Sequence, residues 1–156
     1  MANKKMAIIA TKGALDMAYP PLILASTAAA MGWEVQIFFT FYGLQLLRKD
    51  LSGIAISPIG NPAMPMPVPM PVLVSALPGM QAMASSMMKA KMKKKGVASL
   101  EELRSLCQEA EVKFIACQMT VDLFDFEKSD FIDGIEYGGA ATFMKFAGET
   151  DVCLFI

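Results

Sequence analysis

The sequence predicts one α/β domain of 156 residues, with a doubly wound parallel sheet covered by helices on both faces. Four short runs are continuously apolar, which is typical of strands buried on both faces of a parallel sheet. Helical patterns separate these runs, and strands that alternate with helices over short connections form right-handed βαβ units. A chain of this length buries a sizeable core without disulfides or metals. The four runs are residues 6–10, 35–39, 114–116 with Val112 before them, and 152–156.

Prolines modify this plan at two places. Residues 14–31 are rich in Ala, Leu and Met and predict a helix, but Pro20 and Pro21 fall near its start. Because proline lacks an N–H and clashes with the preceding turn, we expect the first turn to be separate or kinked. Residues 54–56 are apolar and are a candidate fifth strand at the edge of the sheet, ended by Pro58.

A capping box predicts a second helix. Ser99 and Glu102 stand in the order Ser-Leu-Glu-Glu, so the hydroxyl can accept an N–H of the first turn while the carboxylate reaches back to the N–H of the serine. The helix that begins there is expected to bury one apolar face. This face is Leu100, Leu103, Leu106, Cys107 and Ala110.

Residues 60–95 interrupt the alternation of strands and helices, and we expect them to be an insertion or flap within a single domain of residues 1–156. The stretch 51–88 contains no charged residue, seven of the nine prolines and seven of the fourteen methionines. Five of the prolines exclude a helix from the first part and favour extended, polyproline-like backbone. They are Pro62, Pro65, Pro67, Pro69 and Pro71.

The second part of the insertion, residues 72–92, predicts a helix broken at Pro78 and Gly79. Polar residues dilute its apolar content, which argues against a membrane span of about 20 residues. A Met-rich flap or an oligomer contact is the preferred interpretation, because Met adapts to irregular partner surfaces. Peripheral contact of residues 72–95 with a membrane is an alternative, since a lysine cluster closes the helix. The cluster is Lys89, Lys91, Lys93, Lys94 and Lys95.

The composition excludes several kinds of active site. The chain has no histidine, so it has no Ser-His-Asp or Cys-His couple and no histidine-containing zinc site. Its three cysteines form no Cys-x-x-Cys pair, and their odd number and wide spacing favour reduced thiols in the cytoplasm. Residues 1–100 carry ten Lys or Arg against three Asp or Glu (+7), and residues 101–156 carry four against twelve (−8). No aromatic is interleaved with the lysine cluster, so nucleic acid is not an expected partner.

Candidate site residues follow the strands, because ligands of parallel α/β sheets bind beyond the carboxyl ends of the strands. Thr11-Lys12-Gly13, Thr40-Phe41-Tyr42-Gly43 and Cys117-Gln118-Met119-Thr120 follow three of the runs, and only the last contains a nucleophile. If residues 118–124 begin a helix, Cys117 lies among unpaired N–H groups at the positive end of the helix dipole, which favours the thiolate. Lys12 is a candidate for assisting this activation. The alternative is that Cys117 is a small buried residue that ends a strand.

The other two cysteines are weaker candidates. Cys107 falls on the apolar face of its helix, so packing explains it, and a resolving thiol for Cys117 is the alternative. Cys153 lies inside the last apolar run and is expected to belong to the core.

Three further patterns are weaker evidence for an anion or metal site. The pair Gly138 and Gly139 before an Ala-rich stretch is a weak candidate for holding an anion at a helix N-terminus. Met64, Met66 and Met70 offer thioether sulfur to Cu(I), but apolar packing is the preferred interpretation. An acidic series lacks the ligand spacing of a calcium loop, so it predicts a solvated surface and no metal site. The series is Asp122, Asp125, Glu127, Asp130, Asp133 and Glu136.

The segment Phe-Ile-Ala-Cys-Gln-Met-Thr-Val-Asp-Leu-Phe, residues 114–124, resembles the cysteine motif of the DsrE/DsrF-like family of small sulfur-relay and sulfur-oxidation proteins. The resemblance covers most of the chain apart from residues 60–95. It is closest to a branch with a Met/Pro-containing insertion and a Cys-x-Met-[Ser/Thr] turn. The other similar pieces are residues 6–13, 38–43, 134–140 and 151–156.

This resemblance implies a flavodoxin-like three-layer fold with a parallel sheet of about five strands, and homo-oligomeric assembly. It implies that Cys117 carries sulfane sulfur as a persulfide or thiosulfonate, with Cys107 matching a secondary cysteine found only in part of the family. Rhodanese-type donors and TusA-type carriers are the partners that it implies. The pocket or anion site expected around the thiol is made of Lys12, Gly13, Thr40, Tyr42, Gln118, Met119, Thr120, Gly138 and Gly139.

The sequence therefore predicts a cytoplasmic sulfur carrier or sulfurtransferase. Such a carrier needs a thiolate, N–H donors for an anionic persulfide and an apolar cover, which we expect from residues 62–92. It needs no general base, metal or cofactor. The alternative is a non-catalytic binding or assembly subunit that uses residues 62–92 to dock a partner or a membrane surface, and a third is small-molecule binding in the cleft without chemistry.

Overall fold

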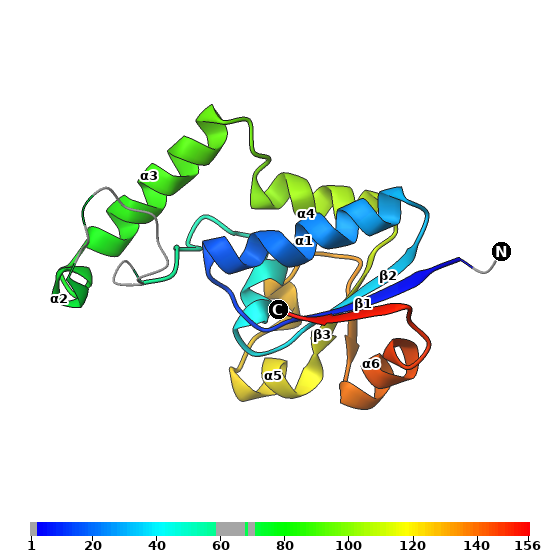
Figure 1. Cartoon of the computed structure of the whole chain (residues 1–156). Helices are drawn as coiled ribbons and strands as arrows, with labels where there is room; N and C mark the ends of the chain where they lie inside the picture. Colours follow the sequence, from blue (N-terminus) through cyan, green and yellow to red (C-terminus); the bar gives the residue numbers. More distant parts are fainter. Residues whose placement is uncertain (1–2, 59–67, 69–70) are drawn as a thin grey trace.

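A five-stranded parallel sheet with helices on both faces forms the body of the protein in the computed structural model, which describes residues 3–58, 68 and 71–156 (Figure 1). Every pair of neighbouring strands is parallel, and the order across the sheet is β4-β3-β2-β1-β5. The predicted α/β class and parallel sheet are confirmed. The strands are β1 (Lys5–Ala10), β2 (Glu34–Phe39), β3 (Lys113–Cys117), β4 (Glu136–Gly138) and β5 (Val152–Phe155).

The fifth strand is not the predicted one. Residues 54–56 form no strand, because side chains of helix α3 (Met80–Lys94) bind the backbone of Ile56. The Ile56 N–H donates to Ser85 Oγ at 3.0 Å, and Gln81 Nε2 donates to the Ile56 carbonyl. The fifth strand is β4, which lies at the other edge of the sheet beside β3. Its sequence, Glu-Tyr-Gly, has no apolar run that would reveal a strand.

Two layers of helix enclose the sheet. The helices α1 and α4 lie side by side over one face, and α5 and α6 lie below the other (Figure 1). Short 3₁₀ segments follow β2 and α5. The elements are α1 (Leu15–Ala30), η1 (Phe41–Leu47), α4 (Leu100–Glu109), α5 (Gln118–Leu123), η2 (Lys128–Asp130) and α6 (Ala140–Ala147).

Helix α1 is continuous through Pro20 and Pro21, so the expectation of a separate first turn is wrong. The two prolines remove two helical N–H donors, and the packing of the same helix compensates for this loss. Pro21 is itself buried, next to the core residue Leu22.

Helix α4 begins with the predicted capping box. The Glu102 N–H donates to Ser99 Oγ at 3.2 Å, and the Ser99 N–H donates to Glu102 Oε2 at 2.7 Å. The predicted buried face is wrong at two positions, since Leu106 is 50% exposed and Ala110 is also exposed. Arg104 is buried instead, because its Nη1 donates to the carbonyls of Leu46 and Arg48 at 2.8 and 2.6 Å.

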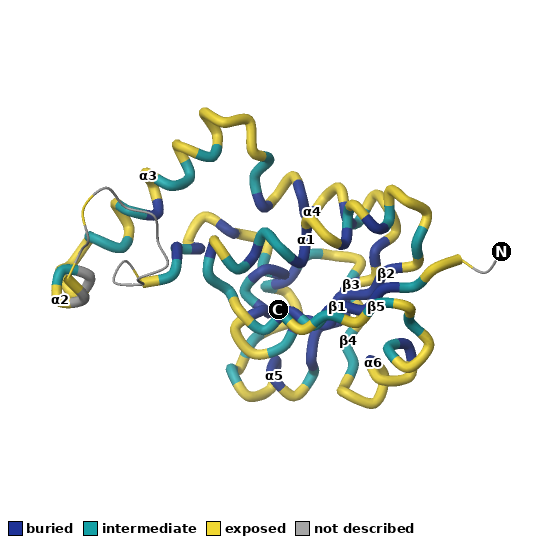
Figure 2. Tube along the Cα trace, in the orientation of Figure 1, coloured by how far each residue is buried: buried dark blue, intermediate teal, exposed yellow. Residues whose placement is uncertain are grey.

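The arm, formed by α2 (Val72–Ser75) and α3 (Met80–Lys94), projects beyond the sheet (Figure 1). The predicted break at Pro78 and Gly79 is confirmed, with Gly79 in the left-handed region at φ 83°. Most of the arm is exposed (Figure 2). Pro71 is extended, whereas the predictions for Pro62, Pro65, Pro67 and Pro69 and for Met64, Met66 and Met70 fall outside the described residues. Among the residues that the structure describes, no helix combines the length and apolarity needed to cross a membrane.

Each face of the sheet has its own hydrophobic core. The larger core lies under α1 and α4 and includes Phe39 and Phe114, whose rings meet edge to face at 5.3 Å. The smaller core lies on the α6 side, where Phe38 stacks on Phe143 at 5.1 Å between ring centroids. Alternate residues of each strand therefore enter different cores.

Two glycines allow η1 to press against the end of β1. A Cβ at Gly43 would overlap the carbonyl oxygen of Ala10, and a Cβ at Gly13 would stand 2.5 Å from the carbonyl oxygen of Tyr42. Both of these oxygens are backbone atoms, so they cannot move aside by a change of rotamer as a side chain can. The segment that follows β2 is therefore held at a fixed distance from the sheet.

Replacing Gly43 by alanine should lower the free energy of unfolding by about 2–3 kcal/mol, since overpacking against rigid neighbours typically costs this much. Urea unfolding followed by circular dichroism measures the change. Gly53→Ala is the matched control, because no atom lies within 4 Å of a Cβ built at Gly53. Equal stability of the two variants would contradict the proposed close approach.

Candidate functional site

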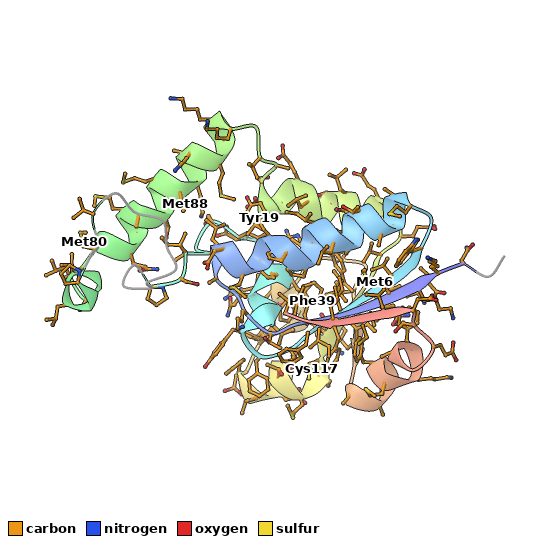
Figure 3. All side chains as sticks on the ribbon, in the orientation of Figure 1. Met6, Tyr19, Phe39, Met80, Met88 and Cys117 are labelled. Carbon is orange, nitrogen blue, oxygen red and sulfur yellow. The ribbon has the colours of Figure 1, made fainter. Side chains whose placement is uncertain are left out.

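Cys117 stands where β3 ends and α5 begins. It is the last residue of β3 and the N-cap residue of α5, so the predicted helix start directly after it is confirmed. Its side chain is 5% exposed and belongs to the smaller core, on the α5 and α6 side of the sheet (Figure 3). The thiol is thus at the carboxyl end of a central strand, sheltered from bulk water.

The register of the sheet brings the ends of two neighbouring strands beside this thiol. Phe39 of β2 pairs with Ala116 of β3, so the next residues, Thr40 and Cys117, stand at the same level. On the other side, Gly138 of β4 pairs directly with Cys117. Neighbouring strands are about 4.8 Å apart, which places a hydroxyl on one side of the sulfur and glycine backbone on the other.

The surroundings of Cys117 favour its charged form. Burial by itself raises the pKa of the thiol, but hydrogen-bond donors more than offset this effect and the pKa lies below its ordinary value. The donors are the hydroxyls of Thr120 and Thr40 and the N–H groups of Thr120 and Met119. The Cys117 side chain forms no capping hydrogen bond to α5. We therefore expect these donors to stabilise mainly the thiolate form of Cys117. All four are uncharged groups.

Exposed apolar side chains lie on the two elements next to the thiol, α5 and η1. They are Met119 and Leu123 of α5 and Phe41 and Tyr42 of η1. The ring of Tyr42 stacks on Phe124 with 6.0 Å between centroids, which ties η1 to the end of α5. We call these four side chains the apolar rim.

Comparison with known proteins agrees with this geometry. Residues 2–155 match the model of the DsrE/DsrF/DrsH-like family. The chain belongs to this family. The sulfur carrier protein DsrE2 of Allochromatium vinosum is 69% identical over 160 residues, with all of both chains covered. The uncharacterized protein YrkE of Bacillus subtilis is 34% identical, with 99% of this chain and 98% of that protein covered.

A solved structure shows the same fold. The ychN protein from E. coli superposes with a TM-score of 0.55 at 12% sequence identity, over 98% of this chain and 99% of that chain. At this identity the likeness concerns the fold alone. The family resemblance and the three-layer α/β fold with a parallel sheet of about five strands expected from the sequence are confirmed.

Of the pocket residues predicted for this DsrE/F-like chain, only some lie at the thiol. Thr40, Met119 and Thr120 supply the donors, and Gly138 is the strand partner. Lys12 is exposed and is not among the groups that act most strongly on the pKa of Cys117. The predicted assistance by this lysine therefore has no support in the structure.

The remaining predicted pocket residues have other surroundings. Gly13 packs against the Tyr42 carbonyl and lines a separate pocket of about 690 Å³ with Gln45 and Arg48. The Gln118 side chain donates to Asp122 Oδ1 at 2.7 Å, and Gly139 is the N-cap of α6.

The expected apolar cover over Cys117 does not come from the described part of residues 62–92. Ala84, Met88 and Met92 of α3 pack against the larger core, which lies on the opposite face of the sheet from Cys117. Polar bonds from Gln81 and Ser85 also hold α3 at the loop after η1. Among the described residues, Cys117 is buried with Phe38, Phe143 and other members of the smaller core.

The surroundings of Cys107 fit a packing role. Its side chain is fully buried in the larger core, and its Sγ donates to the Leu22 carbonyl at 3.4 Å. Burial raises the pKa of this thiol to about 11, which disfavours the reactive thiolate. Cys107 and Cys117 belong to cores on opposite faces of the sheet, an arrangement that gives no support to a resolving role.

Cys153 is exposed, so its predicted place in the core is wrong. It lies on β5, an edge strand of the sheet, and alternate residues of this strand are exposed. The run 152–156 is continuously apolar, but Val152 and Leu154 pack against the larger core while Cys153 and Phe155 are exposed.

The acidic series forms a surface rather than a metal site in the described part of the chain. No three carboxylate or thiol side chains gather there as they would around a metal ion. Glu127 and Asp130 instead form a capping box at the start of η2, and most of the series is exposed.

The raised pKa of Cys107 predicts a loss of stability in alkali. Its folded pKa of about 11 exceeds the ordinary thiol value of 9.0, so its contribution is complete below pH 9 and is lost as the pH rises through 11. Since one pKa unit corresponds to about 1.4 kcal/mol, wild type should lose about 2–3 kcal/mol more than Cys107→Ala over this range.

Urea unfolding of both proteins at a series of pH values measures this difference, and titrating groups common to both cancel. Cys153→Ala is the control and should lose stability in parallel with wild type, because it also removes one thiol but leaves Cys107 in place. Parallel curves for wild type and Cys107→Ala would show that the burial of Cys107 does not alter its titration.

Proposed function

We propose that this protein is a sulfur carrier that holds sulfane sulfur on Cys117 as a persulfide or thiosulfonate. The observation that carries the proposal is the thiol at the end of β3, where neutral donors stabilise its thiolate beside the apolar rim. Membership of the DsrE/DsrF/DrsH-like family and the 69% identity to a protein named sulfur carrier protein DsrE2 support the same function.

The chemistry requires only what the site contains. The Cys117 thiolate attacks the sulfane sulfur of a donor, a new S–S bond forms, and the S–S bond of the donor breaks with its electron pair on the donor's leaving group. Oxidant, metal and general base are not needed for this exchange. The same donors that hold the thiolate can hold a transferred anionic sulfur close by.

The proposed partners are proteins of the same chemistry. A rhodanese-type protein is the proposed donor and a TusA-type carrier is the proposed acceptor, both on the ground of the family. Assembly with further copies of the chain is also proposed. The exposed rim of Met119, Leu123, Phe41 and Tyr42 is the surface through which a partner thiol would approach.

Sulfur loading tests the proposal directly. After incubation with polysulfide or thiosulfate, intact-mass measurement should show added sulfur on wild type and on Cys107→Ser and Cys153→Ser, but not on Cys117→Ser. The three variants are matched controls for one another, since each retains two thiols. Loading of Cys117→Ser at the wild-type level would assign the sulfur to another residue.

The arm favours a second candidate function, the docking of a partner or a membrane surface. Met83 and Met87 of α3 and Leu73 and Leu77 are exposed, and basic residues fill the last turn of α3. Such a surface suits association, because methionine adapts to irregular partners and lysine favours anionic ones.

Met83→Gln/Met87→Gln should weaken association without affecting sulfur loading on Cys117. Light scattering measures the molar mass in solution, and sedimentation with phosphatidylglycerol vesicles measures membrane binding. Ser86→Ala, on an exposed part of the same helix, is the control. Unchanged mass and unchanged sedimentation in the double variant would exclude docking through these methionines.

A further inference from the structure

We propose that Thr120 and Thr40 act as one positioning pair for sulfur release, donating a hydrogen bond to Cys117 Sγ as it becomes the leaving group. This inference rests on the proposed function and assigns a role to two residues that do not themselves carry sulfur. It concerns the discharge step, in which an acceptor thiol takes the outer sulfur from the persulfide.

Thr120 is placed by the start of α5. It is the third residue after the N-cap Cys117, and a side chain at this position reaches back toward the N-cap residue, as in a capping box. The side chain is completely buried. A buried hydroxyl must use its hydrogen-bonding capacity within the protein, so its partners define its direction.

The partners of Thr120 leave one proton of the pair for the sulfur. Its Oγ1 accepts the N–H of Phe41 at 3.2 Å, and it lies 3.2 Å from Thr40 Oγ1. The two hydroxyls hold two protons, of which one lies between their oxygens. If Thr40 donates to Thr120, Thr120 retains a proton for Cys117, and if Thr120 donates to Thr40, Thr40 retains one. Either arrangement supplies one donor to Sγ.

The backbone around Phe41 is arranged for this contact. Phe41 has φ 47°, in the left-handed region that non-glycine residues rarely adopt, and its N–H points at Thr120 Oγ1. Such conformations persist where the surrounding structure imposes them. Here the close packing of Gly43 on Ala10 fixes the segment directly after Phe41.

The step is balanced without any further reagent. The acceptor thiolate attacks the outer sulfur of the Cys117 persulfide, the new S–S bond forms on the acceptor, and the bond between Sγ and the outer sulfur breaks. The electron pair of that bond remains on Sγ, which becomes a thiolate. A thiol of lower pKa leaves faster, so donors that stabilise this thiolate accelerate discharge.

No charged side chain is among the groups that act most strongly on Sγ, so the hydroxyls and amides dominate its titration. Tyr137 of β4 is half-buried, but it packs against the larger core on the other face of the sheet. The other titratable residues on the elements packed around Sγ are exposed. They are Lys12 after β1, Tyr42 on η1, Asp122 on α5, Glu136 on β4 and Lys145 on α6.

The test compares Thr40→Val/Thr120→Val with Thr40→Ser/Thr120→Ser, which retains both hydroxyls. Each protein is loaded with polysulfide and freed of donor, and the loss of one sulfur atom to 2-mercaptoethanol is followed by intact mass. Discharge from the valine variant should be about threefold to tenfold slower than from wild type, and the serine variant should restore the rate. Thr27→Val, an exposed position on α1, is the control.

A second readout separates positioning from a structural effect. The pH midpoint of Cys117 alkylation by iodoacetamide, measured on its own peptide by mass spectrometry, should move to higher pH in the valine variant and return in the serine variant. Should the double valine variant fail to fold, Thr120→Val alone should show the same two changes in smaller degree.

The outcomes distinguish this inference from the proposed function. A wild type that never loads sulfur overturns both. A wild type that loads normally, with a valine variant that discharges at the wild-type rate or keeps the wild-type alkylation midpoint, overturns the positioning pair and leaves the carrier function standing.

Discussion

The site depends on the close approach of two backbone segments at the end of β1. Gly43 lies so near the Ala10 carbonyl that no side chain fits between them, and Gly13 lies equally close to η1. This contact fixes where the chain turns after β2, and the turn contains Thr40 and Phe41. The contact of Gly43 with the end of β1 therefore helps to position Thr40 beside Cys117, although β1 and β3 are separated by β2.

The sheet separates two thiols of opposite character. Cys107 lies in the core under α1 and α4, where burial outweighs a backbone hydrogen bond from Ser26 and raises the pKa of the thiol to about 11. Cys117 is also buried, but polar donors from α5 and from the end of β2 outweigh burial and lower its pKa. The contrast shows that burial alone does not make a cysteine inert. The donors that accompany burial determine whether the thiolate can form.

Much of the fold could be predicted because its signals are local. Continuous apolar runs mark β1, β2 and β3, and the capping box at Ser99 marks the start of α4. The errors arose where tertiary contacts override local pattern. The backbone of Ile56 forms hydrogen bonds with side chains of α3 instead of with a neighbouring strand. Strand β4 forms from three residues that contain no apolar run.

Cys117 could be found in the sequence because a strand that passes directly into a helix is visible there. The role of its hydroxyl donors could not, since it depends on the register of β2 with β3 and on the left-handed backbone of Phe41. Neither is encoded in a short motif. Thr40 and Thr120 are 80 residues apart in the chain, and only the fold brings their hydroxyls to 3.2 Å.

Neutral donors suit a carrier better than a histidine or a lysine would. A cation beside the sulfur would stabilise the thiolate more strongly, but a thiolate that is too stable is a weaker nucleophile for the next donor. A histidine would also change its charge near neutral pH and alter the reactivity of the sulfur with it. Hydroxyl and amide groups keep the same charge across this range. The absence of histidine from the sequence is thus consistent with a thiol that must accept and release sulfur under the same conditions.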